Sequence, residues 1–119
     1  MALPFTRHLV TKIVLPVADM DAAADFYGRA GFEIVRYDPG YTWVKHCGFE
    51  VLHLALVPGL DRSANHAAGY VHVADARAWH AALTEAGIEA SPVVDEPWEM
   101  REFSVVDPDH NLLRFGQNL

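Results

Sequence analysis

The side chains of this sequence that could do chemistry do not form a catalytic motif. Its seven histidines and its single cysteine, Cys47, are spread over different segments without the spacing of a metal site. No serine or cysteine lies in a nucleophile elbow or a triad-like pattern, and no glycine-rich phosphate loop is present. The four carboxylates between residues 95 and 102 could supply an acid and a base, although solvated surface charge is the more common use of such a run. We therefore predict no catalytic residue and no cofactor.

Aromatic residues in the first half of the chain are better suited to binding a flat molecule. Tyr37, Tyr41, Trp43 and Phe49 lie on neighbouring expected strands or turns, and alternation along a strand places Tyr41 and Trp43 on one face. Such rings stack on planar heteroaromatic groups, and packing against the sheet or a partner subunit is their alternative use. The net charge of −7 argues against nucleic acid, which needs a basic face, and fits a cationic ligand.

Composition sets further limits. The length of 119 residues and the hydrophobic share of 51% correspond to one domain with one core, residues 1–119. No apolar run reaches the length that crosses a membrane, and the N-terminus lacks the pattern of a signal peptide. The lone Cys47 is typical of a reducing compartment. We expect a cytoplasmic protein with neither a membrane nor a nucleic-acid partner.

These side chains are positioned by a structural unit that the sequence contains twice. Segments 14–34 and 70–90 align without a gap, and their identical positions include the pairs Asp19 with Asp75 and Gly31 with Gly87. Each copy has the pattern of a strand, an aspartate N-cap, an amphipathic helix and a glycine stop. The repeat predicts two similar halves that face each other across a cleft.

In the first half, alternation predicts a strand around residues 13–17, and Asp19 caps a helix that reaches Arg29. The expected buried stripe of this helix is Met20, Ala23, Ala24 and Tyr27. Turn residues at 38–40 and 46–48 separate three further strands. These strands are expected at 33–37, 41–45 and 50–57.

The second half repeats this order. A strand is expected near Tyr70, and the helix after Asp75 is expected to bury Trp79, Ala82, Leu83 and Ala86. Further strands are expected near Ser91, Arg101 and Leu112. The fold class is therefore α+β, with two βαβββ modules in tandem, the first at about residues 10–57 and the second at about 68–118. The modules form a cup-shaped mixed sheet with the helices on its outer face.

Alternation also assigns side chains to the inside of the cup. On the last strand of the first module, Leu52 and Leu54 form the core face, which turns His53 to the other side. In the second module, Arg114 is likewise opposed to Leu113 and Phe115.

The chain resembles the vicinal-oxygen-chelate superfamily of glyoxalases, ring-cleaving dioxygenases and antibiotic-resistance proteins. The resemblance rests on the paired modules, on the motifs at residues 15–19, 26–27 and 31–33, and on the closing Asp-Pro-Asp-His-Asn turn at 107–111. Within the superfamily, residues 96–103 followed by Asp107-Pro108 are similar to a stretch of the bleomycin resistance proteins. His110 stands where the family usually has glycine, so it must accept a conformation that glycine favours.

The resemblance implies metal-ligand positions at Lys12, at His53, near Ala68 and at Arg114. Only His53 could bind a metal in its ordinary state, because protonated lysine and arginine have no lone pair to offer a metal and alanine has no ligand atom. Catalytic metals need about three protein ligands, so we expect no metal site. The alternative is a lyase or dioxygenase with an unrecognised metal set centred on His53.

The resemblance to bleomycin resistance proteins implies a homodimer whose subunit-interface crevices sequester a cationic, partly planar, bleomycin-like small molecule without changing it. A binder of another planar molecule is a second alternative. In the dimer, the first strand either swaps between subunits or stays with its own chain. The expected ligand-binding residues are Tyr41, Trp43, Phe49, His53, Trp98, Glu102, Ser104 and Arg114.

Overall fold

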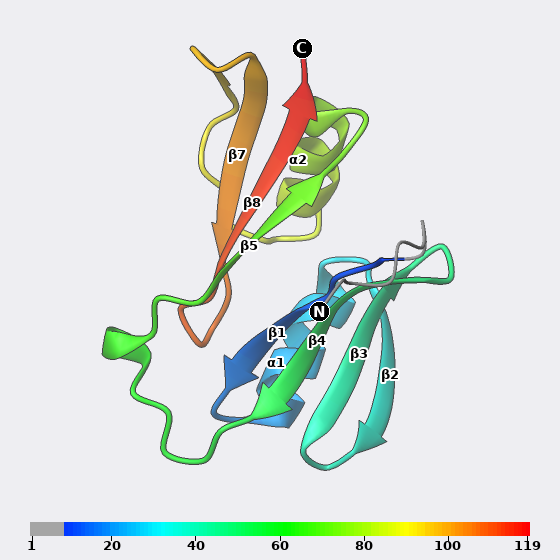
Figure 1. Cartoon of the computed structure of the whole chain (residues 1–119), viewed down its shortest axis with the longest axis vertical. Coiled ribbons are helices and arrows are strands. Elements are labelled where there is room, and N and C mark those ends of the chain that lie inside the picture. The colour runs from blue at the N-terminus through cyan, green and yellow to red at the C-terminus, as the bar shows by residue number, and fades with distance from the viewer. Residues whose placement is uncertain (1–8) are drawn as a thin grey trace, which may run out of the picture.

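The computed structural model describes residues 9–119, which form two modules of the same design (Figure 1). The first module contains β1 (Ile13–Val17), α1 (Met20–Arg29), β2 (Glu33–Asp38), β3 (Tyr41–His46) and β4 (Phe49–Leu56). A connection with one 3-10 turn, Arg62–Ala64, leads to the second module. That module contains β5 (Ala68–His72), α2 (Ala76–Glu85), β6 (Val94–Glu96), β7 (Met100–Val106) and β8 (Leu112–Asn118). The expected α+β fold of two βαβββ modules is confirmed.

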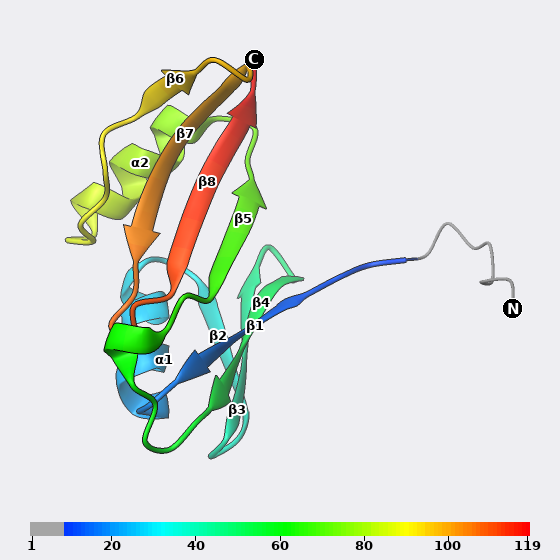
Figure 2. The ribbon, with the colours of Figure 1, turned by 60° about the vertical axis from the view of Figure 1, so that its left-hand side comes forward.

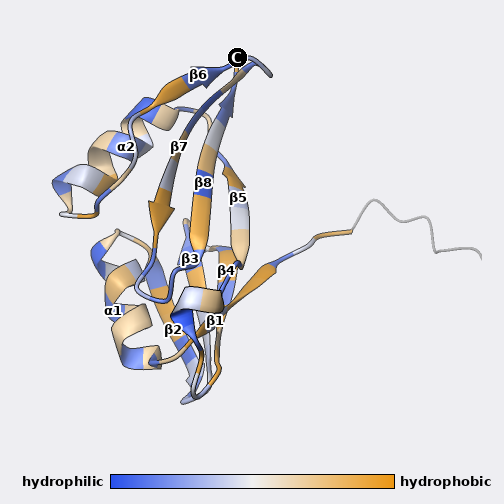
Figure 3. Cartoon of the chain, turned by 90° about the vertical axis from the view of Figure 1, so that its left-hand side faces the viewer, coloured by the Kyte–Doolittle hydropathy of each residue, from blue (hydrophilic) through white to orange (hydrophobic). Residues whose placement is uncertain are grey.

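Each module forms its own four-stranded mixed sheet. The strand orders are β1-β4-β3-β2 and β5-β8-β7-β6, so the two sheets have the same topology. In each sheet the first and last strands of the module pair in parallel, and the other neighbours are antiparallel. Figures 2 and 3 show the two sheets one above the other, with both helices on the same side. The internal repeat of the sequence is therefore a repeat of topology.

Both helices begin as the sequence predicts. The carboxylate of Asp19 accepts a hydrogen bond from the Ala22 amide at 3.1 Å, and that of Asp75 accepts one from the Ala78 amide at 3.0 Å. Such caps satisfy backbone donors that a helix start leaves free. Each helix has ten residues, and no helix in the described part of the chain is long and apolar enough to cross a membrane.

The core follows the predicted alternation in the first module. Leu52 and Leu54 are buried, whereas His53 between them lies half-buried on the other face of β4. The expected stripe of α1 is buried, and Phe26, which was not expected there, is buried as well. Burying these side chains between α1 and its sheet is the main favourable contribution to folding.

The predicted stripe of α2 is partly wrong. Leu83 is buried and Trp79 is half-buried, but Ala82 and Ala86 are exposed. Ala82 lies at the edge of a hollow between the two helices instead of against the sheet. The strand expected near Ser91 is present as β6, but it begins only at Val94. The Ser91 amide instead bonds the Ser104 carbonyl at 2.9 Å outside a regular ladder.

The closing turn of the second module, residues 107–111, is hydrogen-bonded to the first module. Asp109 accepts a hydrogen bond from the Ala18 amide, and the side-chain amide of Asn111 donates to the Pro16 carbonyl, both at 2.9 Å. His110 has φ 67°, the conformation expected for a residue in the position of a glycine. This joint sets how the two sheets, and therefore the candidate site residues, lie relative to each other.

Candidate functional site

Three of the expected ligand-binding residues meet on the first sheet. Trp43 on β3 is paired directly with His53 on β4, and their ring centroids are 6.4 Å apart. The Tyr41 hydroxyl lies 2.6 Å from Nδ1 of His53, and the two rings meet edge to face. The face of the sheet opposite α1 therefore carries a compact group of rings, which we call the first-sheet cluster: Tyr41, Trp43 and His53.

Both ring nitrogens of His53 are in use. Nε2 lies 2.5 Å from the carboxylate of Glu50, while Nδ1 faces Tyr41. The hydrogen bond from His53 holds the pKa of Glu50 below its ordinary value. Lys12 donates to the Glu50 carbonyl at 2.7 Å and adds a positive charge beside this group. His53 therefore has no free lone pair to offer a metal in this arrangement.

A second group of residues surrounds the carboxylate of Glu102 on the second sheet. Glu102 is 7% exposed, and its Oε2 accepts hydrogen bonds from the Tyr70 hydroxyl at 2.6 Å and the Trp98 indole N–H at 3.0 Å. The Nε of Arg114 lies 4.0 Å from Oε1. These residues are the second-sheet cluster: Tyr70, Trp98, Glu102 and Arg114.

Ionisation in the second-sheet cluster follows from these contacts. Burial acts to raise the pKa of Glu102, but the hydrogen bonds from Tyr70 and Trp98 and the charge of Arg114 outweigh it, so the pKa lies below its ordinary value. Desolvation and the hydrogen bond to Glu102 raise the pKa of Tyr70 to about 12. At neutral pH the cluster therefore presents a carboxylate held by a neutral phenol.

A pocket of about 250 Å³ opens beside this carboxylate. Four expected ligand-binding residues, Trp98, Glu102, Ser104 and Arg114, lie in its wall. Arg114 also borders a neighbouring hollow of about 240 Å³ that contains Tyr70. The structure thus brings together the four residues expected from the second half of the sequence. The pocket is completed by Ser91, Pro92, Val94, Glu96 and Phe103.

The two clusters occupy equivalent positions in the repeat. In the first sheet, His53 is paired with Val14 and Trp43. In the second sheet, Arg114 is paired with Tyr70 and Ser104. The two clusters lie on different sheets of the chain.

Phe49 is the expected residue that the structure brings neither into a cluster nor into the pocket beside Glu102. Its side chain is 76% exposed at the start of β4, and none of the ring contacts among residues 9–119 includes it. The chain turns sharply just before it, where Cys47 has φ 49°.

Sequence reasoning missed Tyr70 and Glu50. The repeat aligns Tyr70 with Val14, and the pairing of β5 with β8 places it beside Arg114. The strand pattern therefore contained a signal for Tyr70. No local pattern pointed to Glu50, which lies three residues before its partner His53 on β4.

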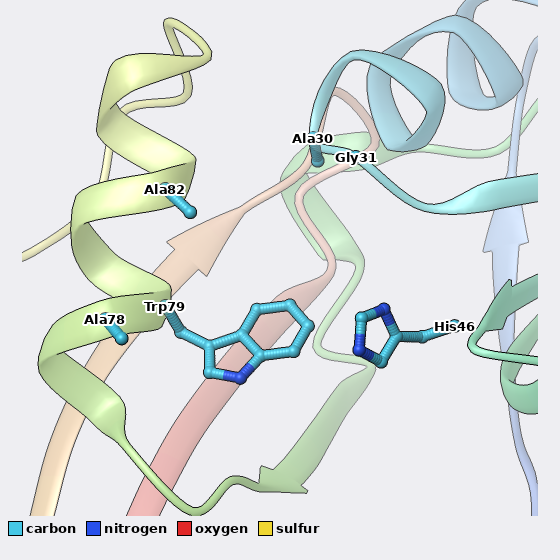
Figure 4. Close-up of a pocket in the computed structure, with 6 residues that line it drawn as sticks. All are labelled: Ala30, Gly31, His46, Ala78, Trp79 and Ala82. Atoms are coloured by element: carbon cyan, nitrogen blue, oxygen red, sulfur yellow. The ribbon is translucent and has the colours of Figure 1, made fainter.

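A separate hollow of about 370 Å³ lies between the end of α1 and the side of α2 (Figure 4). The side chains of Trp79 and His46 point toward each other in its wall, and their rings meet edge to face with centroids 5.0 Å apart. Trp79 also stacks on Phe32 and Phe115, one from each module. None of the expected ligand-binding residues borders this hollow, and its rings hold the two modules together.

The metal positions implied by the superfamily do not fit a divalent metal. Lys12 and Arg114 place positive charges there, and both nitrogens of His53 are engaged. Within residues 9–119, no group of three histidine, cysteine or carboxylate side chains is arranged to hold a metal ion. A repulsive site with a single occupied imidazole lacks the donors that Zn²⁺ or Fe²⁺ requires.

Comparison with known proteins agrees with this fold. A bleomycin resistance protein from Klebsiella pneumoniae is 33% identical over 113 residues, which cover 87% of this chain and 88% of that protein. The crystal structure of a bleomycin-binding protein complexed with bleomycin superposes with a TM-score of 0.84 at 29% identity, covering 92% of this chain and 98% of that one. A bleomycin-binding protein from bleomycin-producing Streptomyces verticillus, complexed with copper(II)-bleomycin, gives a TM-score of 0.78 at 25% identity, covering 93% and 97% of the two chains.

The model of one protein family, the Glyoxalase/Bleomycin resistance protein/Dioxygenase superfamily, matches residues 8–115. This match spans both modules and the turn that joins them. The chain belongs to the glyoxalase/bleomycin resistance protein/dioxygenase superfamily.

Proposed function

We propose that this protein binds a bleomycin-like antibiotic and confers resistance by sequestering it. The observation that carries the proposal is the similarity to a bleomycin resistance protein over nearly the whole of both chains. Two solved bleomycin-binding proteins with the same fold support it. Sequestration needs no bond to form or break, which agrees with the lack of fit to a metal.

The two clusters supply the kinds of contact that such a ligand needs. Trp98 is 59% exposed and Trp43 is half-buried, so both offer ring faces for stacking on planar groups. The net charge of −7 attracts a cationic molecule toward the protein. Aromatic faces combined with a few fixed polar groups are typical of small-molecule sites.

We also infer a homodimer in which each crevice combines the first-sheet cluster of one protomer with the second-sheet cluster of its partner. Each cluster alone is open, and its surroundings expose apolar side chains. A partner chain would cover these side chains and the edges of the sheets. Exposed apolar side chains of the chain include Tyr37, Phe49, Trp98 and Val106. A cytoplasmic location belongs to the same proposal.

Two other functions are separated by cheap observations. A binder of another planar molecule would show the same crevice but no affinity for bleomycin. A lyase or dioxygenase would require a metal that the residues at the superfamily positions do not fit, and stoichiometric metal in the purified protein would support it.

The direct test is a titration of the protein with metal-free bleomycin, followed by tryptophan fluorescence and by calorimetry. We expect saturable binding with one drug per protomer. Trp98→Ala and Tyr41→Ala should each weaken binding by about tenfold or more, because each removes a ring from the crevice. Trp98→Phe, which keeps a ring, should retain part of the affinity. No binding by the wild type would reject the proposal, and unchanged affinity in both alanine variants would place the crevice elsewhere.

A further inference from the structure

The side chain of Glu102 lies largely buried in the pocket wall, and only one of its two carboxylate oxygens accepts hydrogen bonds from the protein. Oε2 receives two hydrogen bonds, from Tyr70 and Trp98. Oε1 receives none from residues 9–119, and the closest approach of a cation in this part of the chain is Arg114 Nε at 4.0 Å. Oε1 is not enclosed by the protein, because the Thr42 hydroxyl is the only enclosed side-chain polar atom without a hydrogen-bond partner in residues 9–119. Oε1 is therefore an acceptor that a bound molecule can use.

Arg114 supplies the complementary donor. Its side chain is 48% exposed and borders the same pocket as Glu102. The separation of 4.0 Å is too long for a hydrogen bond, so the contact with Glu102 leaves the N–H groups of the guanidinium available to a ligand. The pocket thus holds an acceptor and a donor next to each other, and their charges balance.

We propose that the Glu102–Arg114 pocket binds a neutral amide group of the ligand. The amide N–H donates to Oε1 of Glu102, and the amide carbonyl accepts from Arg114. A ligand ammonium would satisfy Glu102 but would lie against the guanidinium, and a ligand carboxylate would have the reverse conflict. This proposal adds a specific contact to the proposed drug binding. It rests on the proposed function only in assigning the amide group to a bleomycin-like molecule.

Tyr70 is the positioning residue of this pocket. Its hydroxyl holds Oε2 of Glu102, which leaves Oε1 as the free acceptor. The ring reaches that position by lying over Gly116 on the neighbouring strand, where a β carbon would collide with the Tyr70 hydroxyl and ring. Glycine at position 116 therefore makes room for the contact between β5 and β7.

Three small probes with one ring and different charges test the proposal without the drug. Benzamide is neutral, benzylammonium is positive and benzoate is negative. Binding is followed by the NMR signal of the Trp98 indole N–H, with the signals of Trp43 and Trp79 as internal controls. We expect benzamide to shift the Trp98 signal saturably and to bind at least about fivefold more tightly than either charged probe, the factor that one hydrogen bond typically contributes.

Variants show whether the named groups are responsible. Glu102→Gln and Tyr70→Phe should each weaken the binding of benzamide by about fivefold. Glu102→Gln replaces the carboxylate acceptor with an amide, and Tyr70→Phe removes the hydroxyl that holds the carboxylate in place. Glu102→Gln should also strengthen the binding of benzoate, because the negative charge of Glu102 that repels it is gone. A purely structural role of Glu102 would not change this preference between probes. Glu85→Gln, at an exposed position on α2, is the matched control and should leave all three affinities unchanged.

The outcomes separate the two proposals. Tighter binding of benzylammonium or benzoate by the wild type, or no saturable shift of Trp98, would overturn the amide pocket. Bleomycin binding without benzamide binding would overturn the pocket and leave the proposed function standing. Benzamide binding without bleomycin binding would overturn the proposed function alone.

Discussion

The hydroxyl of Tyr27 on α1 donates a hydrogen bond of 2.7 Å to Oδ2 of Asp107 in the closing turn of the second module. The two residues are 80 positions apart in the chain, and both are almost fully buried. The other carboxylate oxygen of Asp107 accepts from the amides of Asp109 and Asn111, which shapes the turn itself. Tyr27 is therefore where the helix of one module holds the turn of the other.

Removing this hydroxyl should destabilise the protein. Tyr27→Phe leaves a buried carboxylate oxygen with one donor fewer, and we expect the free energy of unfolding to fall by about 1–3 kcal/mol. Urea denaturation measures the change. Tyr37→Phe, which alters a residue that is 66% exposed, is the control and should change stability by less than about 0.5 kcal/mol. Equal effects of the two variants would mean that the joint is not held by this bond.

Thr42 offers the opposite effect. Its side chain is fully buried on β3, and its hydroxyl is the only buried side-chain polar atom in residues 9–119 without a hydrogen-bond partner. Thr42→Val replaces that hydroxyl with a methyl group, so stability should rise by about 1 kcal/mol. Thr84→Val is the control, because its hydroxyl donates to the His80 carbonyl at 2.8 Å. A loss of stability in Thr42→Val would mean that water reaches this hydroxyl.

Gly116→Ala should disturb the second-sheet cluster more than it disturbs the fold. The added β carbon meets Tyr70, so the phenol must leave Glu102. We expect weaker ligand binding, by about fivefold, with a smaller change in melting temperature than Tyr27→Phe causes. Gly28→Ala on α1 is the control, because its β carbon would lie 3.6 Å from Ile34, an ordinary contact. That variant should keep full binding and gain about 0.5–1 kcal/mol of stability. Unchanged binding in Gly116→Ala would contradict the role given to Tyr70.

The ionisation of Tyr70 gives a test by pH. Its folded-state pKa of about 12 lies above the value of about 10 for an unfolded chain, so the protonated phenol favours the folded state. This contribution is fully present below pH 10 and is lost as the pH rises through about 12.

Ultraviolet titration of the phenolates of wild type and Tyr70→Phe isolates this group. The difference between the two curves should be centred near pH 12. In Gly116→Ala the corresponding difference should move toward pH 10, because Tyr70 has lost its carboxylate partner. A wild-type difference centred at pH 10 would show that Tyr70 does not hold Glu102.

Much of the fold could be read from local pattern. Alternation placed β1 and β4, and the paired aspartates Asp19 and Asp75 marked the starts of both helices. The prediction failed on α2, where Ala82 and Ala86 are exposed although their spacing matches a buried stripe. The spacing of apolar residues on a helix predicts which of them can face a sheet. How many of them are buried depends on how the second sheet and the first module pack around α2.

The candidate site divides in the same way. Alternation predicted that His53 and Arg114 point away from the helices, because the side-chain period of a strand depends only on neighbouring residues. The partners of these residues could not be predicted, since they depend on the register between strands that are distant in the sequence.

Tertiary structure likewise decides which carboxylate oxygen of Glu102 accepts hydrogen bonds. Its donors come from β5 and from the loop before β7, and the space for one of them comes from a glycine on β8. The repeat, the caps and the faces of the strands follow from interactions within a few residues and are written in the sequence. The joint at Tyr27 and the free oxygen of Glu102 exist only once long-range packing has brought distant segments into contact.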